Sequence, residues 1–102
     1  MGARIPVPDA EIEQFCRRHR IVKLSLFGSV LGAGFRPDSD IDVLIEFESG
    51  AAPGLFALAR MERELATLFG GRRVDLRTPA DLSRYFRDEV MAMADVRYAQ
   101  GR

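Results

Sequence analysis

The sequence predicts a small α/β (α+β) domain in which helices pack against a mixed sheet of about three strands. Two observations favour this class: short runs rich in apolar and β-branched residues, and stretches around them with apolar residues at helical spacing. A length of 102 residues suits one domain, residues 1–102, with a single core. A hydrophobic fraction of 47% is ordinary for a globular protein and argues against a disordered chain.

The first half of the chain predicts a helix, a buried strand, a turn and a half-buried strand. The helix opens at residues 8–9. One of its faces is apolar: Ile12, Phe15 and Cys16. Residues 21–27 are apolar and β-branched enough for a buried strand, which Gly28 ends before a short helix or turn. Residues 40–48 alternate between apolar and polar side chains, as expected for a strand with one buried face.

The second half predicts a helix, a short strand and a last helix. Residues 55–69 form the first of these helices, which Gly70-Gly71 ends. Its apolar positions recur at helical spacing: Leu55, Leu58, Leu65, Leu68 and Phe69. Residues 72–77 form the strand, and residues 78–81 start the last helix, which runs towards Tyr98. A stripe on this helix is expected to face the core: Leu82, Phe86, Val90 and Met93.

Composition narrows the classes of function. A formal net charge of zero gives no general attraction to nucleic acid or to an anionic membrane, so direct nucleic-acid binding is not expected. Cys16 is the only cysteine, which excludes an internal disulfide and favours a reducing compartment. The sequence shows no signal-peptide pattern and no apolar stretch of about 20 residues that would span a membrane. We therefore expect a soluble, cytoplasmic protein.

The most informative motif is the pair Gly28-Ser29, followed after ten residues by Asp40 and Asp42. Gly28 lets the backbone approach phosphates closely, and Ser29 offers a hydroxyl and an N–H at the start of a turn. Asp40 and Asp42 have the same parity on the second strand, so their side chains point the same way, about 6.5–6.8 Å apart. Asp75 lies on the polar face of a later strand and can complete the set of carboxylates.

Carboxylates in this arrangement suit divalent metal ions. Magnesium prefers a few carboxylates together with phosphate oxygens, and two ions about 3.5–4 Å apart are the arrangement used in phosphoryl chemistry. Attack on an α-phosphorus with pyrophosphate leaving would be stabilised by the metals and by nearby cations, and Asp75 could help to deprotonate the attacking hydroxyl. Arg36 lies between the two halves of the motif, and Arg77 shares the face of Asp75. The pattern therefore indicates metal-dependent nucleotidyl transfer.

Three other interpretations of these residues fit less well. The aspartates within residues 38–42 match the first ligands of a calcium loop, but Val43 and Ser49 stand where that loop needs glycine and glutamate. No Gly-Lys-Ser or Gly-Lys-Thr sequence is present, which excludes a P-loop. Residues 32–34 begin like a dinucleotide fingerprint, but Pro37 occupies the position of its third glycine.

The stretch from Leu26 to Phe47, LFGSVLGAGFRPDSDIDVLIEF, resembles the signature of the minimal nucleotidyltransferase (MNT) family in the DNA polymerase β superfamily. That signature is Gly-Ser, ten residues, then Asp-x-Asp. Residues 72–79, RRVDLRTP, resemble the strand that bears the family's third carboxylate. The order of elements matches a whole minimal domain, so the resemblance covers nearly the entire chain and implies the nucleotidyltransferase fold.

The resemblance also implies roles for individual residues. The family's metal-binding aspartates fall on Asp40, Asp42 and Asp75, and its phosphate-binding pair falls on Gly28 and Ser29. It further implies ATP as the donor and magnesium as the cofactor.

The chain departs from the family pattern at Gly32-Ala33-Gly34, where many members carry an arginine or acidic residues after the Gly-Ser turn. If that arginine helps to hold phosphate, Arg36 or Arg77 would have to replace it. We take Arg36 as the candidate nucleotide-binding cation.

Members of this family are commonly antitoxins encoded beside a HEPN-domain ribonuclease toxin, and some transfer AMP to a tyrosine of that toxin. The resemblance therefore implies a HEPN-type partner. The chain has no substrate domain of its own, so a partner, or a second copy in a homodimer, would present the acceptor. Two functions remain: AMP transfer, favoured by the three aspartates, and inhibition by stoichiometric binding with weak catalysis, favoured by the glycines of residues 32–34. A third, modification of a small molecule such as an aminoglycoside, lacks the extra domain that would bind one.

Overall fold

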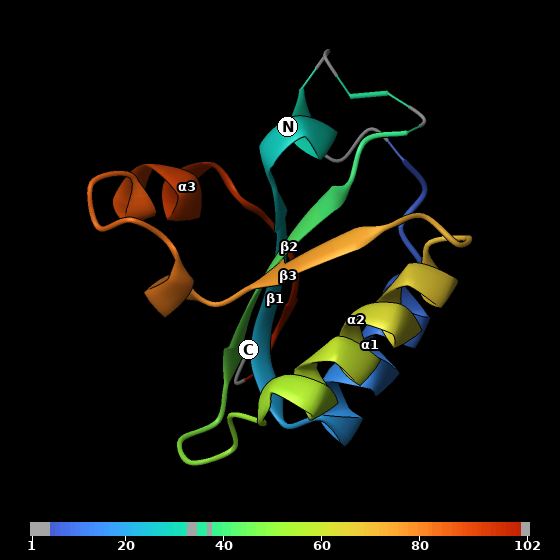
Figure 1. Cartoon of the computed structure of the whole chain (residues 1–102), viewed down its shortest axis with the longest axis vertical. Coiled ribbons are helices and arrows are strands. Elements are labelled where there is room, and N and C mark those ends of the chain that lie inside the picture. Colours follow the sequence, from blue (N-terminus) through green and yellow to red (C-terminus); the bar gives the residue numbers. More distant parts are fainter. Residues whose placement is uncertain (1–4, 33–34, 37, 101–102) are drawn as a thin grey trace.

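The computed structural model describes residues 5–32, 35–36 and 38–100. Helices and strands alternate along most of the chain (Figure 1). In order they are α1 (Asp9–Arg18), β1 (Ile21–Phe27), the 3₁₀ helix η1 (Gly28–Leu31), β2 (Ile41–Phe47), α2 (Leu55–Leu68), β3 (Val74–Arg77), the 3₁₀ helix η2 (Pro79–Asp81), α3 (Arg87–Met93) and β4 (Asp95–Ala99). Within the described residues, no helix is both long and apolar enough to cross a membrane.

The strands form one mixed sheet in the order β3-β2-β1-β4. β1 pairs antiparallel with β2 and with β4, whereas β2 and β3 are parallel. Parallel neighbours need a crossover connection, and α2 supplies it between β2 and β3. As a result, the first residues of β2 and β3 lie side by side, with Ile41 opposite Val74 and Asp42 opposite Asp75.

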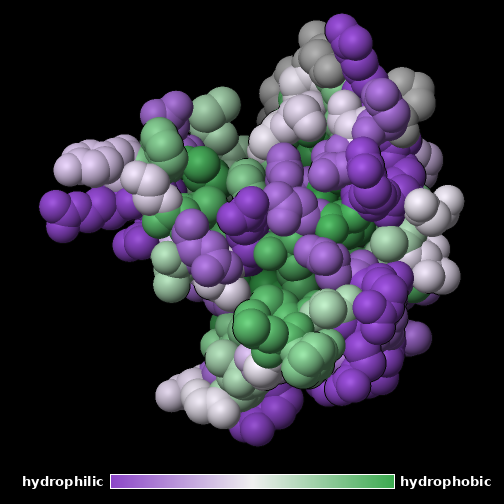
Figure 2. All heavy atoms as spheres, viewed as in Figure 1, coloured by the Kyte–Doolittle hydropathy of each residue, from purple (hydrophilic) through white to green (hydrophobic). Residues whose placement is uncertain are grey.

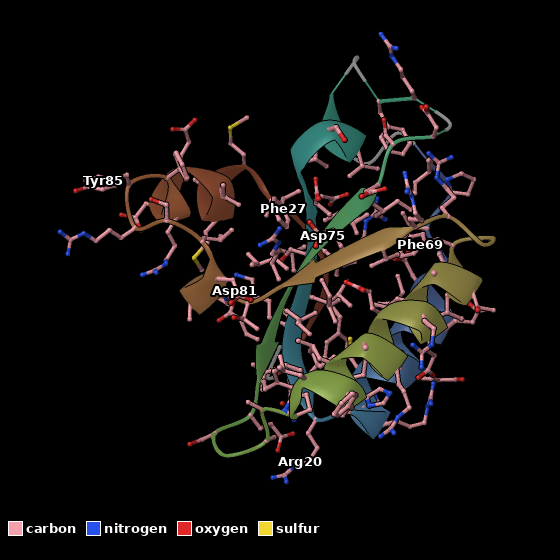
Figure 3. All side chains as sticks on the ribbon, in the orientation of Figure 1. Arg20, Phe27, Phe69, Asp75, Asp81 and Tyr85 are labelled. Carbon is pink, nitrogen blue, oxygen red and sulfur yellow. The ribbon has the colours of Figure 1, made fainter. Side chains whose placement is uncertain are left out.

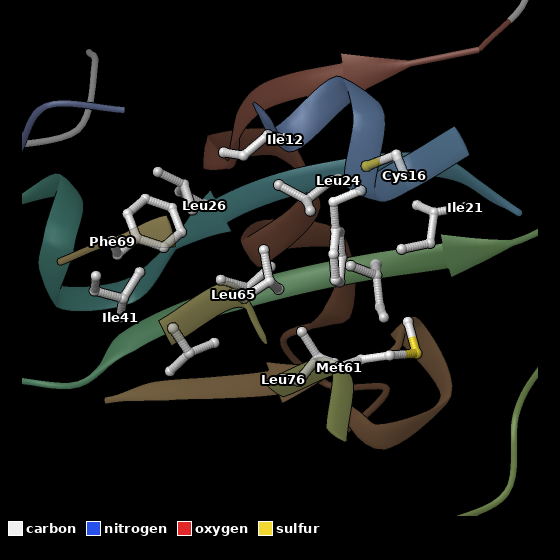
Figure 4. Packing of buried hydrophobic residues seen from close by; sticks show 14 of the residues in the cluster. Ile12, Cys16, Ile21, Leu24, Leu26, Ile41, Met61, Leu65, Phe69 and Leu76 are labelled. Carbon is white, nitrogen blue, oxygen red and sulfur yellow. The ribbon is translucent and has the colours of Figure 1, made fainter. Parts of the chain in front are cut away.

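The core lies between the sheet and the pair of helices α1 and α2, which lie on the same side of the strands (Figures 1 and 4). The apolar face predicted for α1 is fully buried: Ile12, Phe15 and Cys16. α2 contributes Met61 and Leu65. The other buried members of the cluster come from the strands and the segments that adjoin them: Ile21, Leu24, Leu26, Val30, Ile41, Val43, Ile45, Phe69, Val74 and Leu76.

The opposite face of the sheet is covered more thinly. Leu44 and its cross-strand neighbour Ser25 are both buried on this face. η2 contacts β2, and α3 lies on this side of the strands in Figure 1. α3 contributes no buried residue, so this face can present polar side chains next to partly open apolar ones.

The C-terminal part of the fold differs from the sequence prediction. The sequence predicts a last helix running towards Tyr98, but α3 ends at Met93 and Asp95–Ala99 form β4, which gives the sheet four strands rather than about three. This segment pairs with the free edge of β1, and Tyr98 packs against the core, so long-range pairing outweighs local helix propensity. The predicted core stripe is also wrong, since Phe86 is 57% and Met93 is 70% exposed.

The packing of α2 can be tested with two leucines from the same helix. Leu65 is fully buried, and we expect Leu65→Ala to lower the free energy of unfolding by about 2–5 kcal/mol because it leaves a cavity in the core. Leu55, which the sequence pattern places on the core face, is instead 85% exposed, and Leu55→Ala should change stability by no more than about 0.5 kcal/mol. Urea unfolding of both variants measures the difference. Equal losses would contradict this placement of α2.

Candidate active site

The turn between β1 and η1 accepts only glycine at its first position, for two reasons. Gly28 has φ +75°, a left-handed conformation that strains any residue with a side chain. In addition, a Cβ atom on Gly28 would overlap the Oδ2 atom of Asp42. The Gly-Ser turn therefore lies directly against the second aspartate of the motif, and Ser29 is exposed beside it at the start of η1.

The three predicted aspartates meet at one corner of the sheet. Asp42 and Asp75 are direct neighbours in the parallel register of β2 and β3, so their side chains leave the same face. Asp40 comes just before β2, and the negative charges of Asp40 and Asp75 both act on Asp42. Figure 3 labels Asp75 on β3 and Phe27 at the end of β1, and Phe27 is the cross-strand partner of Asp42.

Two of the three carboxylates are paired with arginines from the β3 segment. The Arg73 Nε atom lies 3.0 Å from Asp40 Oδ1. Arg77 donates to Asp75 Oδ2 from Nε at 3.3 Å and from Nη2 at 3.2 Å, and this hydrogen bond raises the pKa of Arg77. In the part of the chain that the structure describes, no three acidic, histidine or cysteine side chains surround a single ion position. Asp40 and Asp75 each form an ion pair with an arginine instead.

The charges of the cluster change the pKa of Asp42. Its pKa is raised, first by partial burial and then by the negative charges of Asp75 and Asp40, while Arg77 opposes the shift. A group of oxygen donors with excess negative charge fits a hard divalent cation such as magnesium. The residues present therefore fit the predicted metal, provided that Asp40 and Asp75 exchange their arginine partners for it.

Further contacts hold the loop that leads into β2. Arg72 donates from Nη2 to the carbonyl oxygen of Arg36 at 2.9 Å, and its guanidinium lies 4.5 Å from the centre of the Phe35 ring. The backbone N–H of Arg36 donates to Ser39 Oγ at 3.0 Å. The guanidinium of Arg36 makes no hydrogen bond or ion pair with the described residues, so its phosphate-binding role stays a prediction. Residues 33–34, within the family departure, lie outside the described residues.

Arg73 contacts Asp40, a role that the sequence pattern alone does not indicate. The contact arises because the backbone N–H of Ile41 donates to the carbonyl oxygen of Arg73 at 2.9 Å, which aligns the residues before β2 and β3. The signal in the sequence was the position of Arg73, two residues before Asp75 and therefore of the same strand parity. This position indicates a contact with Asp40 only when the register of β2 and β3 is known, and that register cannot be read from the sequence.

Comparisons with known proteins now identify the family. Residues 10–96 match the family described as "Nucleotidyltransferase domain". The chain belongs to this family. The match confirms both the resemblance and the enzyme class predicted from the sequence.

Individual relatives agree with this assignment. The protein named "Putative protein adenylyltransferase MJ0435" of Methanocaldococcus jannaschii is 31% identical over 74 residues, which cover 72% of this chain and 76% of that protein. A solved structure of a "putative minimal nucleotidyltransferase" is 35% identical with a TM-score of 0.69, covering 84% of this chain and 85% of that one. A complex of tri-AMPylated Shewanella oneidensis HEPN toxin with MNT antitoxin matches at a TM-score of 0.64, 19% identity, and 90% and 70% coverage, and so shows a shared fold.

Asp42→Asn tests the charge cluster in the nucleotidyltransferase. Because the pKa of Asp42 is raised in the folded protein, its ionised form disfavours folding, and protonation at low pH removes that penalty. Without divalent cations, we expect the variant to unfold up to about 5 °C higher than wild type at pH 7, since screened repulsion is worth about 1 kcal/mol or less. The gain should vanish as the pH falls through the raised pKa of Asp42. Magnesium should stabilise wild type more than the variant.

Thermal unfolding with and without magnesium measures these differences. Asp38→Asn is the matched control, because Asp38 is exposed and lies just before the cluster. It should leave both the unfolding temperature and the magnesium response unchanged. A less stable Asp42→Asn variant at pH 7 would contradict the repulsion argument.

Gly28→Ala tests the turn. We expect it to lower the free energy of unfolding by about 1 kcal/mol or more and to abolish nucleotidyl transfer, because the new Cβ displaces the Asp42 carboxylate. Gly70→Ala is the control, since Gly70 has nearly the same φ of +77° and no atom of the described residues lies within 4 Å of its Cβ position. It should lose similar stability and keep its activity. Unfolding curves and transfer assays on both variants separate strain from displacement, and full activity in Gly28→Ala would refute the role given to this glycine.

Proposed function

We propose that this nucleotidyltransferase transfers AMP from ATP to a tyrosine hydroxyl of a HEPN-type toxin, in a reaction that depends on magnesium, and so acts as the antitoxin of that toxin. The single observation that carries the catalytic part is the register that sets Asp42 beside Asp75, next to the Gly28 turn. The choice of AMP and of a protein acceptor is supported by the relative named as a protein adenylyltransferase. The choice of a toxin is supported by the shared fold with an MNT antitoxin bound to an AMPylated HEPN toxin.

The proposed reaction assigns a task to each residue. Asp40, Asp42 and Asp75 would hold magnesium, and the ion would supply positive charge against the negative charge on the transferred phosphate. Gly28 leaves room for the triphosphate beside Asp42, and the hydroxyl and N–H of Ser29 donate hydrogen bonds to its oxygens.

The bonds and the proton balance as follows. The tyrosine oxygen attacks the α-phosphorus, the bond from that phosphorus to the bridging oxygen breaks, and pyrophosphate leaves. Asp75 accepts the tyrosine proton, while Arg77, released from Asp75, and Arg36 offer positive charge to the leaving phosphates. This exchange of partners by Arg77 couples nucleotide binding to the freeing of Asp75.

Inhibition by stoichiometric binding is the second candidate function. One observation favours it: Asp40 and Asp75 are already held by Arg73 and Arg77, as expected for a site that no longer needs a metal. In this alternative the exposed apolar side chains near α3 would contact the toxin without any transfer. The two candidates differ in whether the partner becomes covalently modified.

A labelling experiment separates these functions. The protein is mixed with magnesium, ATP labelled on the α-phosphate, and the product of the neighbouring gene. We expect wild type to label the partner on tyrosine and Asp42→Asn to label it about 10²–10³ times more slowly, since it loses one preorganised electrostatic group. Asp38→Asn should label at the wild-type rate, because that exposed aspartate lies outside the carboxylate set.

Toxin activity is measured in the same mixtures. Neutralisation that disappears in Asp42→Asn together with labelling supports the transfer mechanism. If wild type neutralises the partner without labelling it, the binding mechanism replaces the catalytic one. If Asp42→Asn labels and neutralises as well as wild type, the catalytic role of the carboxylates is wrong.

A further inference from the structure

A cavity of about 420 Å³ lies between η1 and α3, on the face of the sheet that carries the aspartates. Its walls are mostly apolar, and one carboxylate lies among them: Phe27, Gly28, Leu31, Val90, Met93 and Glu89. Figure 2 shows apolar atoms gathered over the α3 segment. Val90 and Met93, which the sequence pattern places on a core-facing stripe, line this cavity instead.

The cavity adjoins the candidate active site directly. Gly28, which lies against the Asp42 carboxylate, is also one of the residues that line the cavity. Phe27 lines it too and is the cross-strand partner of Asp42. A nucleotide whose phosphates lie at Asp42 and Ser29 therefore has an apolar cavity next to it for its base.

Glu89 influences which ligands this cavity favours. Its carboxylate makes no hydrogen bond or ion pair with the described residues, and it stands beside apolar side chains. An ionised carboxylate only accepts hydrogen bonds. A free negative charge beside a bound triphosphate is unfavourable unless the ligand donates to it, so the site favours a ring that carries an N–H donor.

We propose that the cavity between η1 and α3 binds the nucleobase of the donor nucleotide, and that Glu89 favours a base with an exocyclic amino group, such as adenine, by accepting a hydrogen bond from that group. Phe27, Val90 and Met93 contact the flat ring, and a bound base covers part of Met93, which is 70% exposed without it. The proposal rests on the proposed function, since it assumes that the nucleotide's phosphates lie at the aspartates.

Nucleotide affinity tests the proposal without requiring transfer. Titration calorimetry with magnesium compares ATP with purine riboside triphosphate, which has the same ring and phosphates but no amino group. We expect wild type to bind ATP about tenfold more tightly, as for the loss of a hydrogen bond to a charged group. In Glu89→Ala the two affinities should become equal. In Met93→Ala both should fall by the same factor, because the ring loses one contact.

Asp88→Ala is the matched control, because Asp88 precedes Glu89 on α3, is exposed and does not line the cavity. It should keep the wild-type preference. Equal affinities for both nucleotides in wild type would overturn the role of Glu89. If Met93→Ala binds ATP normally but no longer labels the partner, the cavity holds the acceptor and the base proposal is wrong. None of these outcomes contradicts the proposed function. Undiminished labelling by Asp42→Asn would contradict that function, and the base preference could still be measured.

Discussion

The parallel pairing of β2 with β3 is the constraint on which the site depends. It places Asp42 opposite Asp75, although these residues are far apart in the sequence and α2 lies between them. The register is fixed by the core, because Val43 of β2 and Leu76 of β3 are opposite each other and both belong to the buried hydrophobic cluster. A shift of one residue would turn Leu76 to the open face and Asp75 into the core, which is strongly unfavourable. The hydrophobic face of the sheet thereby sets the geometry of its polar face.

Clustering three carboxylates opposes folding, and the chain offsets this cost with arginines. Asp40 and Asp75 each have an arginine partner, whereas Asp42, which is partly buried beside them, has a raised pKa. A cation that enters the cluster would bind the Asp42 carboxylate directly. At Asp40 and Asp75 it would compete with the two exposed ion pairs to arginine. Exposed pairs of this kind contribute about 1 kcal/mol or less each, so the exchange is energetically accessible to a divalent ion carrying a triphosphate.

Local chemistry made much of this protein predictable. The Gly-Ser turn, the alternation of residues 40–48 and the apolar face of α1 each express a rule that acts within a few residues, and the structure reproduces these elements. The sequence predictions fail where contacts between distant segments of the chain determine the structure. Residues 95–99 become a strand because β1 has a free edge, and Arg73 meets Asp40 because β3 is parallel to β2. Neither the free edge nor the register can be derived from composition or spacing along the chain.

The division of the sheet into two faces separates stability from chemistry. The face under α1 and α2 holds nearly all of the buried apolar side chains, whereas the face towards α3 holds the aspartates and the open cavity. α3 itself is fixed mainly at its start, where Arg87 donates to the carbonyl oxygens of Pro79 and Leu82. A segment attached in this way can adjust to a ligand without disturbing the core. Substitutions on the face that holds the aspartates are therefore expected to leave the core, and with it the fold, in place.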